Sequence, residues 1–332
     1  MTRFALFGAG RIGQIHGHNV ARSAEAELVL VADPDQAAAD RLARATGARV
    51  GTIQEALAAK DVDAVVICTP TDTHAGLIED AARAGKAIFC EKPVDLSAER
   101  VRGCLGVVAQ AGVPLMIGFN RRFDPSFATL RRRIGDGEVG EVELVTILSR
   151  DPAPPPVSYI ARSGGLFRDM MIHDLDMARF LLGEEPVTVY AAASALVDPA
   201  IGQAGDVDTA VVTLKTASGK LCQISNSRRA TYGYDQRIEV HGAKGLLKAG
   251  NMTATTVELA DGRGFTSDPA LPFFLERYDA AYRAELATFI DAIGTGKPPQ
   301  PTGIDGLKAL QLADAADESA RSGRPVSLDL SA

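Results

Sequence analysis

The stretch FALFGAGRIG, residues 4–13, decides the fold. Its first four residues form an apolar run that predicts a buried strand, and the predicted helix Ile12–Arg22 follows. Gly8, Gly10 and Gly13 stand between them with the spacing G-x-G-x-x-G. In this pattern the first glycine permits a tight turn, the second lets a pyrophosphate approach the backbone, and the third lets helix and strand pack closely. The stretch therefore predicts a dinucleotide-binding turn.

An acidic residue stands at the distance from this turn that a dinucleotide site requires. Asp33 follows the second predicted strand, Leu28–Val31, 20 residues after Gly13. A carboxylate there accepts hydrogen bonds from the adenosine ribose hydroxyls and repels the 2′-phosphate of NADP, so the sequence favours NAD. Arg11 is the opposing signal, because a guanidinium could bind that phosphate. The alternative interpretation is a structural glycine-rich turn with Asp33 capping the helix that begins at Pro34.

The rest of residues 1–119 alternates strand-like and helical patterns. The strand-like segments are continuous apolar runs, as expected for parallel strands that are buried on both faces. This alternation predicts an α/β fold for residues 1–119, a Rossmann domain with a doubly wound parallel sheet. The expected strands after the first are Leu28–Val31, Ala64–Cys68, Ala87–Cys90 and Pro114–Phe119, and the expected helices include Pro34–Ala45, His74–Ala84 and Ala98–Gln110.

Residues 120–332 follow a different pattern. From about residue 141, strand-like runs separated by turn signals follow one another with few helices between them, which is typical of a mostly antiparallel sheet. Helices are expected near Phe167–Leu182 and Glu276–Ile293. The sequence thus predicts a second, α+β domain with a large open sheet. Its expected strands are Val142–Leu148, Val187–Ala193, Thr209–Leu214, Lys220–Ser225, Arg237–His241, Gly245–Lys248 and Thr255–Leu259.

Composition limits the classes of partner. The formal net charge is −7, whereas nucleic acids and anionic membranes call for concentrated positive charge. No run approaches the roughly 18 apolar residues of a membrane span, and the amino terminus has no signal-peptide layout. The 4 cysteines are scattered, which favours reduced thiols. We expect a soluble cytoplasmic protein that binds neither nucleic acid nor membrane.

Lys92 is the first candidate for chemistry. It lies in the segment Phe89–Pro93 at the end of the fourth long strand, the carboxyl edge where open α/β sheets bind ligands. A residue before proline is confined to extended backbone, which fixes its position. The alternative is a solvated surface charge, as most lysines are.

A second candidate group lies in the segment 169–176, DMMIHDLD. If this segment is helical, Asp169, His173 and Asp176 fall on one face at i, i+4 and i+7. A carboxylate one turn before a histidine can orient the ring and stabilise the imidazolium, which suits a proton acceptor. The alternative is a solvated acidic face with an incidental histidine. Zinc-ligand spacing and a G-x-S-x-G motif are both lacking, so we predict no metal site and no serine nucleophile.

With these motifs in place, the chain resembles the Gfo/Idh/MocA oxidoreductases, and within them the bacterial myo-inositol 2-dehydrogenases. The resemblance covers essentially the whole chain and rests on motifs spread along it. EKP and D-x-x-x-H are general to the family, whereas the long stretch that begins at Ser163 is more specific. The motifs are GAGRIG (8–13), TPTDTH (69–74), EKP (91–93), GFNRRFDP (118–125), SGGLFRDMMIHDLDMARFLLGEEP (163–186) and SNSRRATYGYDQRIEVHG (225–242).

The resemblance implies a set of site residues. For His74 a structural role, bonding backbone at a strand-to-helix turn, is the preferred interpretation. Asn120 and Ser149 stand where some inositol dehydrogenases carry Met and His. Which tyrosine lines the pocket is left open among Tyr232, Tyr234, Tyr278 and Tyr282. The implied catalytic residues are Lys92, Asp169 and His173; the cofactor contacts are Gly8, Gly10, Arg11, Ile12, Gly13, Asp33, Thr69, Pro70, His74, Glu91 and Lys92; the substrate contacts are Lys92, Asn120, Arg121, Asp151, Asp169, His173 and Asp176.

The reaction implied by the resemblance is oxidation of a ring hydroxyl of a cyclic polyol by NAD, with myo-inositol giving 2-keto-myo-inositol as the leading case. His173 takes the hydroxyl proton, Lys92 stabilises the developing alkoxide, and Asp169 holds both in register, with the formal base left open between Lys92 and His173. A dimer or tetramer is also implied. The alternatives are a dehydrogenase of another inositol isomer or sugar, an NAD-dependent glycoside hydrolase, and a non-catalytic sugar sensor.

Overall fold

The computed structural model describes residues 1–330, except for the side chain of residue 161. Two compact units make up the chain: residues 1–123 with 281–310, and residues 124–280 with the segment from 311 onward. The first unit thus contains a late segment that lies far from it in the sequence. The expected division of the chain into domains 1–119 and 120–332 stays a prediction. Among the described residues, no helix is both long enough and apolar enough to cross a bilayer.

The first unit is built on a six-stranded parallel sheet in the order β3-β2-β1-β4-β5-β6. All five expected strands are present, and β3 is an addition. Because the strands are parallel, their carboxyl ends meet at one edge, and the order reverses between β1 and β4, where such sheets bind ligands. The strands are β1 Thr2–Phe7, β2 Ala26–Ala32, β3 Arg49–Val50, β4 Ala64–Ile67, β5 Ala87–Glu91 and β6 Leu115–Gly118.

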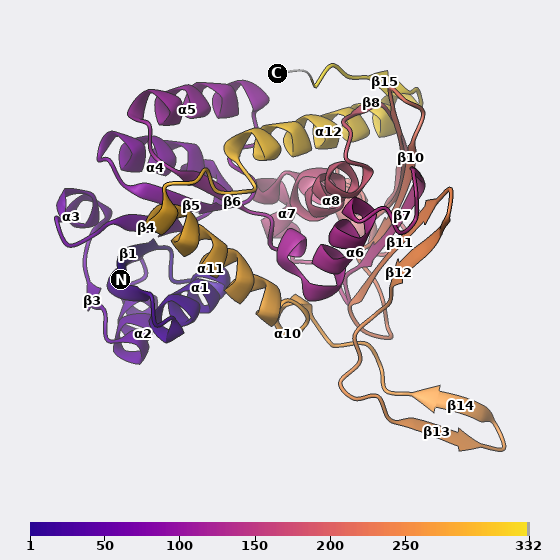
Figure 1. Ribbon diagram of the computed structural model, residues 1–332, viewed down its shortest axis with the longest axis horizontal. Helices are drawn as coiled ribbons and strands as arrows, with labels where there is room; N and C mark the ends of the chain where they lie inside the picture. Colours follow the sequence, from indigo (N-terminus) through magenta and orange to yellow (C-terminus); the bar gives the residue numbers. More distant parts are fainter. Residues whose placement is uncertain (331–332) are drawn as a thin grey trace. The chain divides into compact units, whose positions relative to one another are not determined.

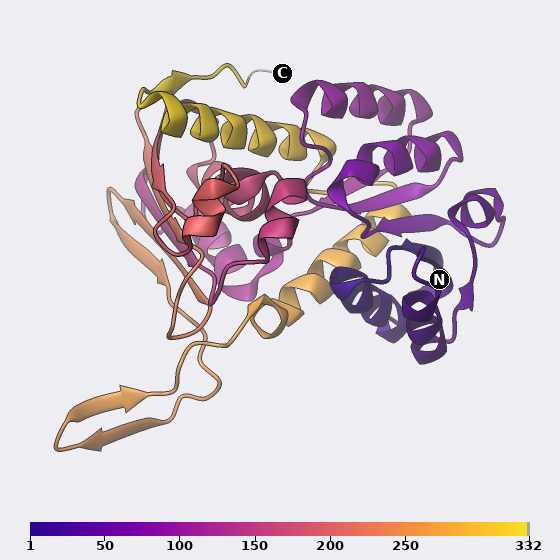
Figure 2. The ribbon, with the colours of Figure 1, turned by 180° about the vertical axis from the view of Figure 1, so that it is seen from behind.

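Helices cover both faces of this sheet. Figures 1 and 2 show α1, α2 and α11 on one face and α4 and α5 on the other. Asp35 caps the start of α2, and Gly47 ends it with a left-handed φ of 80°. The helices are α1 Arg11–Arg22, α2 Gln36–Thr46, α3 Ile53–Ala58, α4 Thr71–Arg83, α5 Ala98–Ala111, the 3-10 helix η1 Asn120–Phe123, and α11 Asp279–Thr295.

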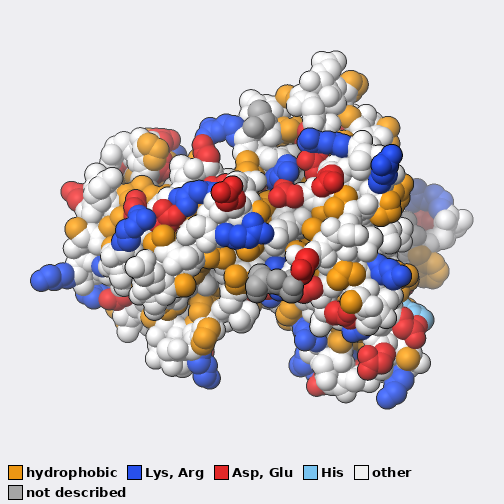
Figure 3. All heavy atoms as spheres, turned by 90° about the horizontal axis from the view of Figure 1, so that it is seen from above, with side chains coloured by type: hydrophobic (Ala, Val, Ile, Leu, Met, Phe, Trp, Pro, Cys, Tyr) orange, Lys and Arg blue, Asp and Glu red, His pale blue; other side chains and the backbone are white. Residues whose placement is uncertain are grey.

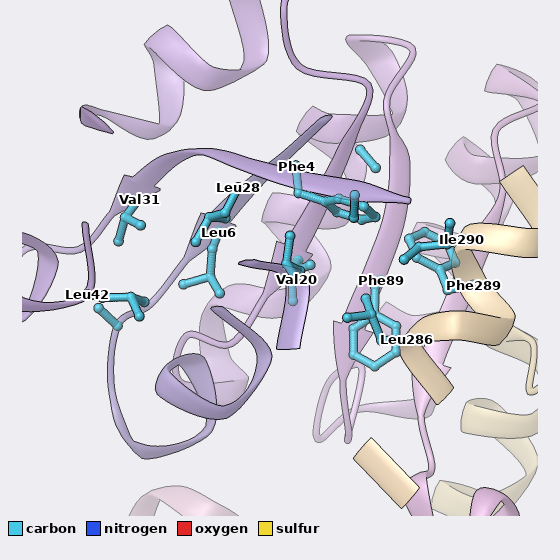
Figure 4. Packing of buried hydrophobic residues seen from close by; sticks show 14 of the residues in the cluster. Phe4, Leu6, Val20, Leu28, Val31, Leu42, Phe89, Leu286, Phe289 and Ile290 are labelled. Carbon is cyan, nitrogen blue, oxygen red and sulfur yellow. The ribbon is translucent and has the colours of Figure 1, made fainter. Parts of the chain in front are cut away.

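Helix α11 completes the core of the first unit. Leu286, Phe289 and Ile290 belong to the same buried cluster as Phe4 of β1 and Phe89 of β5. Figure 4 shows these residues from close by, with the α11 side chains next to Phe4 and Phe89. The rings of Phe89 and Phe289 lie 5.8 Å apart, near the separation that aromatic pairs prefer. A late segment of the chain therefore supplies part of the Rossmann core.

The second unit contains a seven-stranded sheet in the order β12-β11-β7-β10-β9-β8-β15. Only β7 and β10 pair in parallel among these strands, so the sheet is mixed and mostly antiparallel, as expected. Burial alternates along β9, which shows one covered and one open face. The strands are β7 Val142–Arg150, β8 Pro186–Ser194, β9 Thr209–Thr216, β10 Leu221–Ser227, β11 Asp235–Gly242, β12 Gly245–Ala249 and β15 Val326–Ser327.

One expected strand is misplaced. The run Thr255–Leu259 was expected in the large sheet, but its end belongs to a separate hairpin of β13 Glu258–Asp261 and β14 Gly264–Ser267. Every residue of these two strands is exposed, so they lack the buried face that would anchor them in the large sheet. The hairpin projects beyond β12 in Figure 1.

One helix that the sequence patterns did not predict is the 20-residue α12, whose residues 303–310 belong to the first unit and whose later residues belong to the second. Helix α8 packs on β7 and β10 and covers one face of the sheet (Figure 1). On the face drawn in Figure 3, acidic and basic side chains are interspersed. The helices are α6 Pro125–Gly135, α7 Val157–Ser163, the π-helix η2 Leu166–Met171, α8 Ile172–Leu182, α9 Pro199–Gln203, α10 Phe274–Arg277 and α12 Gly303–Ser322.

Candidate active site

The glycine turn between β1 and α1 is shaped by close packing. Gly8 has a φ of 92°, and a Cβ there would lie 2.7 Å from the carbonyl of Cys68. A Cβ on Gly13 would lie only 1.8 Å from the carbonyl oxygen of Gly8. Gly10, at the N-cap of α1, has nothing within 4 Å of its Cβ position. Two glycines are thus required by packing, and the third leaves open space at a helix N-terminus, as a pyrophosphate needs.

Asp33 follows β2 and faces this turn. Its carboxylate accepts a hydrogen bond of 2.5 Å from the backbone N–H of Ala9 and one of 2.7 Å from that of Asp35. Asp33 is only partly buried, so it also faces solvent. The first turn of α1 contains no acidic residue that would oppose an anion. These residues fit a dinucleotide with its pyrophosphate at α1 and its ribose near Asp33.

The turn after β4 is tied to the segment after β5 by His74. The two ring nitrogens of this buried histidine lie 2.7 Å from the carbonyl oxygens of Pro93 and Thr69. The Thr69 hydroxyl lies 2.6 Å from that of Thr73 in the first turn of α4, and Pro70 is the N-cap of that helix. This geometry supports the structural interpretation of His74, and its role in cofactor binding stays a prediction.

Lys92 follows β5 at the carboxyl edge of the sheet. The peptide bond between Lys92 and Pro93 is cis, and the lysine side chain is partly buried. The preceding Glu91 points into the interior, where its carboxylate lies 2.7 Å from Nε2 of His16. Glu91 was predicted to contact the cofactor, and that role stays a prediction. Its observed partner is a histidine of the dinucleotide-binding helix.

Asn120 and Arg121 lie in the 3-10 helix η1, directly after β6. Both are buried polar residues. Since β6 is parallel to β5, η1 begins at the same sheet edge as the segment with Lys92. The first unit therefore brings the predicted dinucleotide turn, Asp33, Lys92 and these two residues to one edge.

The predicted group Asp169, His173 and Asp176 lies in the second unit on two kinds of helix. Asp169 belongs to the π-helix η2, and His173 lies in the first turn of α8. The sequence predicted one continuous α-helix here, whereas the structure has a π-helix followed by an α-helix. Short π-helical segments are frequent at functional sites. Asp169 and His173 are partly exposed, whereas Asp176 is buried, with an oxygen 3.5 Å from Arg179.

Two residues that sequence patterns missed contact Asp169. The hydroxyl of Tyr159, in α7, donates a hydrogen bond of 3.1 Å to Oδ1. Nη2 of Arg228, a side chain that is 1 % exposed, lies 3.7 Å from Oδ2. Arg228 lies in a motif that supported the family resemblance, but nothing in its spacing from Asp169 links the two residues.

The start of η2 is fixed by a close approach of two segments. Gly165 has a φ of 79°, and a Cβ on it would lie 2.5 Å from Oδ1 of Asp206. The same oxygen accepts a hydrogen bond of 3.1 Å from the backbone N–H of Leu166. The glycine is therefore required so that Asp206 can cap the helix that carries Asp169.

Other predicted positions lie at the ends of β7 and β10. Asp151 follows β7, and its backbone N–H donates a 3.0 Å bond to the carbonyl of Ser227. Ser149 is buried and accepts a 2.9 Å bond from Nε2 of Gln236. Gln236 in turn accepts a bond of 3.1 Å from the hydroxyl of Tyr278, one of the candidate pocket tyrosines. Ser149 is thus part of a buried network.

A Rossmann sheet with a glycine turn, followed by an α+β unit with a large mixed sheet, defines a class of dinucleotide-binding oxidoreductases. Residues 2–119 match the model of the oxidoreductase family's NAD-binding Rossmann fold, and residues 131–328 match that of its C-terminal α/β domain. The chain belongs to the Gfo/Idh/MocA oxidoreductase family, and NAD is the cofactor of its first domain.

Three members of the family are similar to this chain over nearly its whole length. An inositol 2-dehydrogenase of Rhizobium meliloti (strain 1021) is 61 % identical, over 98 % of this chain and 99 % of its own. A crystal structure of a myo-inositol dehydrogenase from Corynebacterium glutamicum superimposes with a TM-score of 0.96 at 48 % identity, covering 99 % of both chains. A scyllo-inositol dehydrogenase from Lactobacillus casei, with bound NAD(H) and scyllo-inositol, has a TM-score of 0.92 at 29 % identity, over 98 % and 99 % of the chains.

Proposed function

We propose that this protein is an NAD-dependent inositol 2-dehydrogenase that converts myo-inositol to 2-keto-myo-inositol. The observation that carries the proposal is the 61 % identity, over nearly the full length of both chains, to an inositol 2-dehydrogenase. In the reaction a secondary alcohol loses a hydride from carbon and a proton from oxygen and becomes a ketone. NAD, when bound, accepts the electron pair with one hydrogen, and the hydroxyl proton leaves separately.

We propose Lys92, Asp169 and His173 as the catalytic residues. The Lys92 ammonium donates a hydrogen bond to the reacting oxygen and stabilises the charge that develops there. His173 accepts the hydroxyl proton. The role proposed for Asp169 is to hold Lys92 and His173 in register, and its own carboxylate is contacted by Tyr159 and Arg228. The positions of Lys92 at a sheet edge and of His173 in the first turn of α8, both partly exposed, support these roles.

The remaining substrate hydroxyls are proposed to bond to Asn120, Arg121, Asp151 and Asp176. Each side chain offers donors or acceptors that match a polyol. Among these, Asp176 is buried, with one oxygen 3.5 Å from Arg179, which fixes the orientation of its carboxylate. The cofactor contacts are proposed to be Gly8, Gly10, Arg11, Ile12, Gly13, Asp33, Thr69, Pro70, His74, Glu91 and Lys92.

A second candidate substrate is scyllo-inositol, because a solved relative binds it together with NAD(H). To decide, purified protein is mixed with NAD and each of myo-inositol, scyllo-inositol, D-chiro-inositol, glucose and xylose, and nicotinamide absorbance is followed. We expect the highest kcat/KM with myo-inositol. A higher kcat/KM with another compound of the panel would identify that compound as the preferred substrate. If the protein releases NADH when the substrate is a free polyol, it is not an NAD-dependent glycoside hydrolase. Turnover of any of these compounds shows that it is not a non-catalytic sugar sensor.

We also propose that the protein forms a homo-oligomer, a dimer or a tetramer. The open face of the large sheet carries exposed apolar side chains on several strands, among them Leu144, Tyr190, Val211, Leu221 and Leu246. A row of such residues on a sheet face is typical of a surface that another subunit covers. Light scattering of the purified protein measures the mass, and a monomer at micromolar concentration would contradict the proposal.

Replacing Asp33 with Ser is expected to raise the ratio of NADP to NAD use, measured as kcat/KM, by about tenfold or more, because it removes the charge that repels the 2′-phosphate. Asp33 also holds the turn through Ala9. Asp33→Asn is therefore the matched variant, since its amide oxygen can still accept that bond. An unchanged preference in both variants would show that the carboxylate does not face the ribose.

Replacing Arg228 with Met is expected to lower kcat by about tenfold, because Asp169 loses the cation that holds it. The free energy of unfolding should fall as well, because the largely buried Asp169 carboxylate is left without its cation, so kcat is measured at a temperature where both variants are folded. Arg229→Met is the matched control, because Arg229 is adjacent and exposed. Steady-state kinetics and thermal unfolding of both variants test this. Equal kcat values for the two would show that Arg228 does not act through Asp169.

A further inference from the structure

A buried ionisable cluster in the first unit lies next to Lys92 along the chain. Glu91 ends β5, His16 lies in α1, and Glu285 lies in α11. Nε2 of His16 is 2.7 Å from Oε1 of Glu91 and 4.0 Å from Oε1 of Glu285. His16 and Glu285 are fully buried. None of the roles proposed above uses His16 or Glu285.

The carboxyl group of Glu285 has an unusual environment. Both of its oxygens are buried, and neither has a hydrogen-bond donor among the described residues. An ionised carboxylate without donors is very costly in such a place, so the neutral acid is favoured. Burial first, and the charge of Glu91 second, raise the pKa of Glu285 well above its ordinary 4.5. The neutral acid lies beside the pair formed by Glu91 and His16, with Oε1 4.0 Å from Nε2 of His16.

The surroundings leave Glu91 little freedom to turn away. On one side the His16 ring packs at 4.9 Å from the ring of Phe89 and edge-on at 5.6 Å from that of Tyr282. On the other side, a Cβ on Gly118 of β6 would lie 3.1 Å from the Glu91 carboxyl carbon. The cluster therefore connects the dinucleotide-binding helix, the two strands that lead to the site, and α11.

We propose that His16 and Glu285 are positioning residues for hydrogen transfer: together with Glu91 they form a buried, proton-holding cluster that fixes the end of β5 and, through it, the backbone that carries Lys92. The inference rests on the proposed function, because it assigns the cluster to the placement of a catalytic lysine. A shift of about 1 Å in such a group can cost up to a hundredfold in rate.

The proton on Glu285 makes stability depend on pH with a definite sign. The folded state holds this proton, whereas the unfolded chain releases it above about pH 4.5. The stabilisation is therefore complete below that value and is lost as the pH rises toward the folded pKa. Glu285 faces His16 and Glu91 within the cluster, and Tyr282, Cys68 and Cys90 lie around it. Burial first, and the charge of Glu91 second, raise the pKa values of the two thiols, Cys68 and Cys90.

The first test reads the proton directly. An infrared difference spectrum between the wild type and Glu285→Gln at pH 7.5 should show a carboxylic-acid C=O band that belongs to Glu285. Because Gln has no proton to lose, the Glu285→Gln variant should gain stability relative to the wild type as the pH rises from 6 to 9. Absence of the acid band, or one equivalent of bound metal ion in the purified protein, would overturn the proposal.

The second test separates positioning from folding. His16→Leu is expected to lower kcat at least about tenfold per NADH-binding site, with the Kd for NADH within about twofold of the wild type. His16→Gln, which keeps a donor near Nε2, should recover most of the rate. His18→Leu is the matched control on the same helix, since His18 is not part of the cluster. If His16→Leu does not fold, His16→Asn takes its place, because the shorter amide cannot reach Glu91 from the position of Nε2 and should lower kcat in the same way, whereas His16→Gln should recover the rate.

Three results would contradict the inference: an unchanged kcat in His16→Leu, a loss as large in His18→Leu, or no recovery in His16→Gln. If the wild type oxidises no inositol, the proposed function fails. The infrared band and the metal content still report on the cluster in that case, so the two failures are distinguishable.

Discussion

Replacing Lys92 with Ala is expected to lower the turnover number with myo-inositol by at least about a hundredfold, the usual contribution of a group that stabilises charge on a reacting oxygen. The same loss is expected for His173→Ala, because the hydroxyl proton then has no positioned acceptor. In both variants the Kd for NADH, measured by fluorescence titration, should change far less than the rate. The loss belongs to the chemical step.

The controls for this prediction are exposed residues of the same types. Lys297→Ala in the first unit and His241→Ala on β11 remove a lysine and a histidine far along the chain from the proposed site, and both should retain the wild-type rate. Near-normal turnover in both Lys92→Ala and His173→Ala would show that the catalytic group is elsewhere. A loss in only one of them would show that the other residue is not needed for the chemical step.

Replacing Gly13 with Ala is expected to weaken NADH binding at least about tenfold and to lower the free energy of unfolding by about 1–3 kcal/mol. The added Cβ would lie 1.8 Å from the carbonyl oxygen of Gly8. This oxygen belongs to the backbone, so it cannot move aside as the end of a flexible side chain can. The turn must therefore open, which moves the N-terminus of α1 away from the pyrophosphate. Denaturant unfolding and NADH titration measure the two effects.

Gly106→Ala is the matched control for this change. Gly106 lies inside α5, is exposed, and has nothing within 4 Å of its Cβ position. Alanine there should leave NADH affinity unchanged and stabilise the protein by roughly 0.5–1 kcal/mol, the helix-propensity difference. If Gly13→Ala binds NADH as tightly as Gly106→Ala, the turn does not hold the dinucleotide.

The parallel sheet was predictable because its information is local. Strands that are buried on both faces appear as short apolar runs, and the glycine turn with Asp33 after the next strand is a pattern of fixed spacing. Each of the five expected strands is found within two residues of its predicted ends. In the second unit, the alternation of apolar and polar residues identified most strands of the large sheet.

What could not be predicted depends on contacts between distant segments. Glu285 lies 194 positions after Glu91, and no periodicity in α11 indicates that this helix completes the first unit's core. Tyr159 and Arg228 reach Asp169 from α7 and from just beyond β10, and only the folded chain brings them together. The run Thr255–Leu259 was wrongly joined to the large sheet because a strand pattern does not state its pairing partner.

The most direct test of the proposed reaction follows the hydrogen itself. Myo-inositol carrying deuterium only on C2 is incubated with the protein and NAD, and the reduced nicotinamide is analysed by NMR and mass spectrometry. The account predicts one deuterium per NADH, at C4 of the nicotinamide, together with a slowed rate if hydrogen transfer limits turnover. Unlabelled NADH formed from this substrate would show that another ring carbon is oxidised, and no NADH at all would contradict the assignment of myo-inositol.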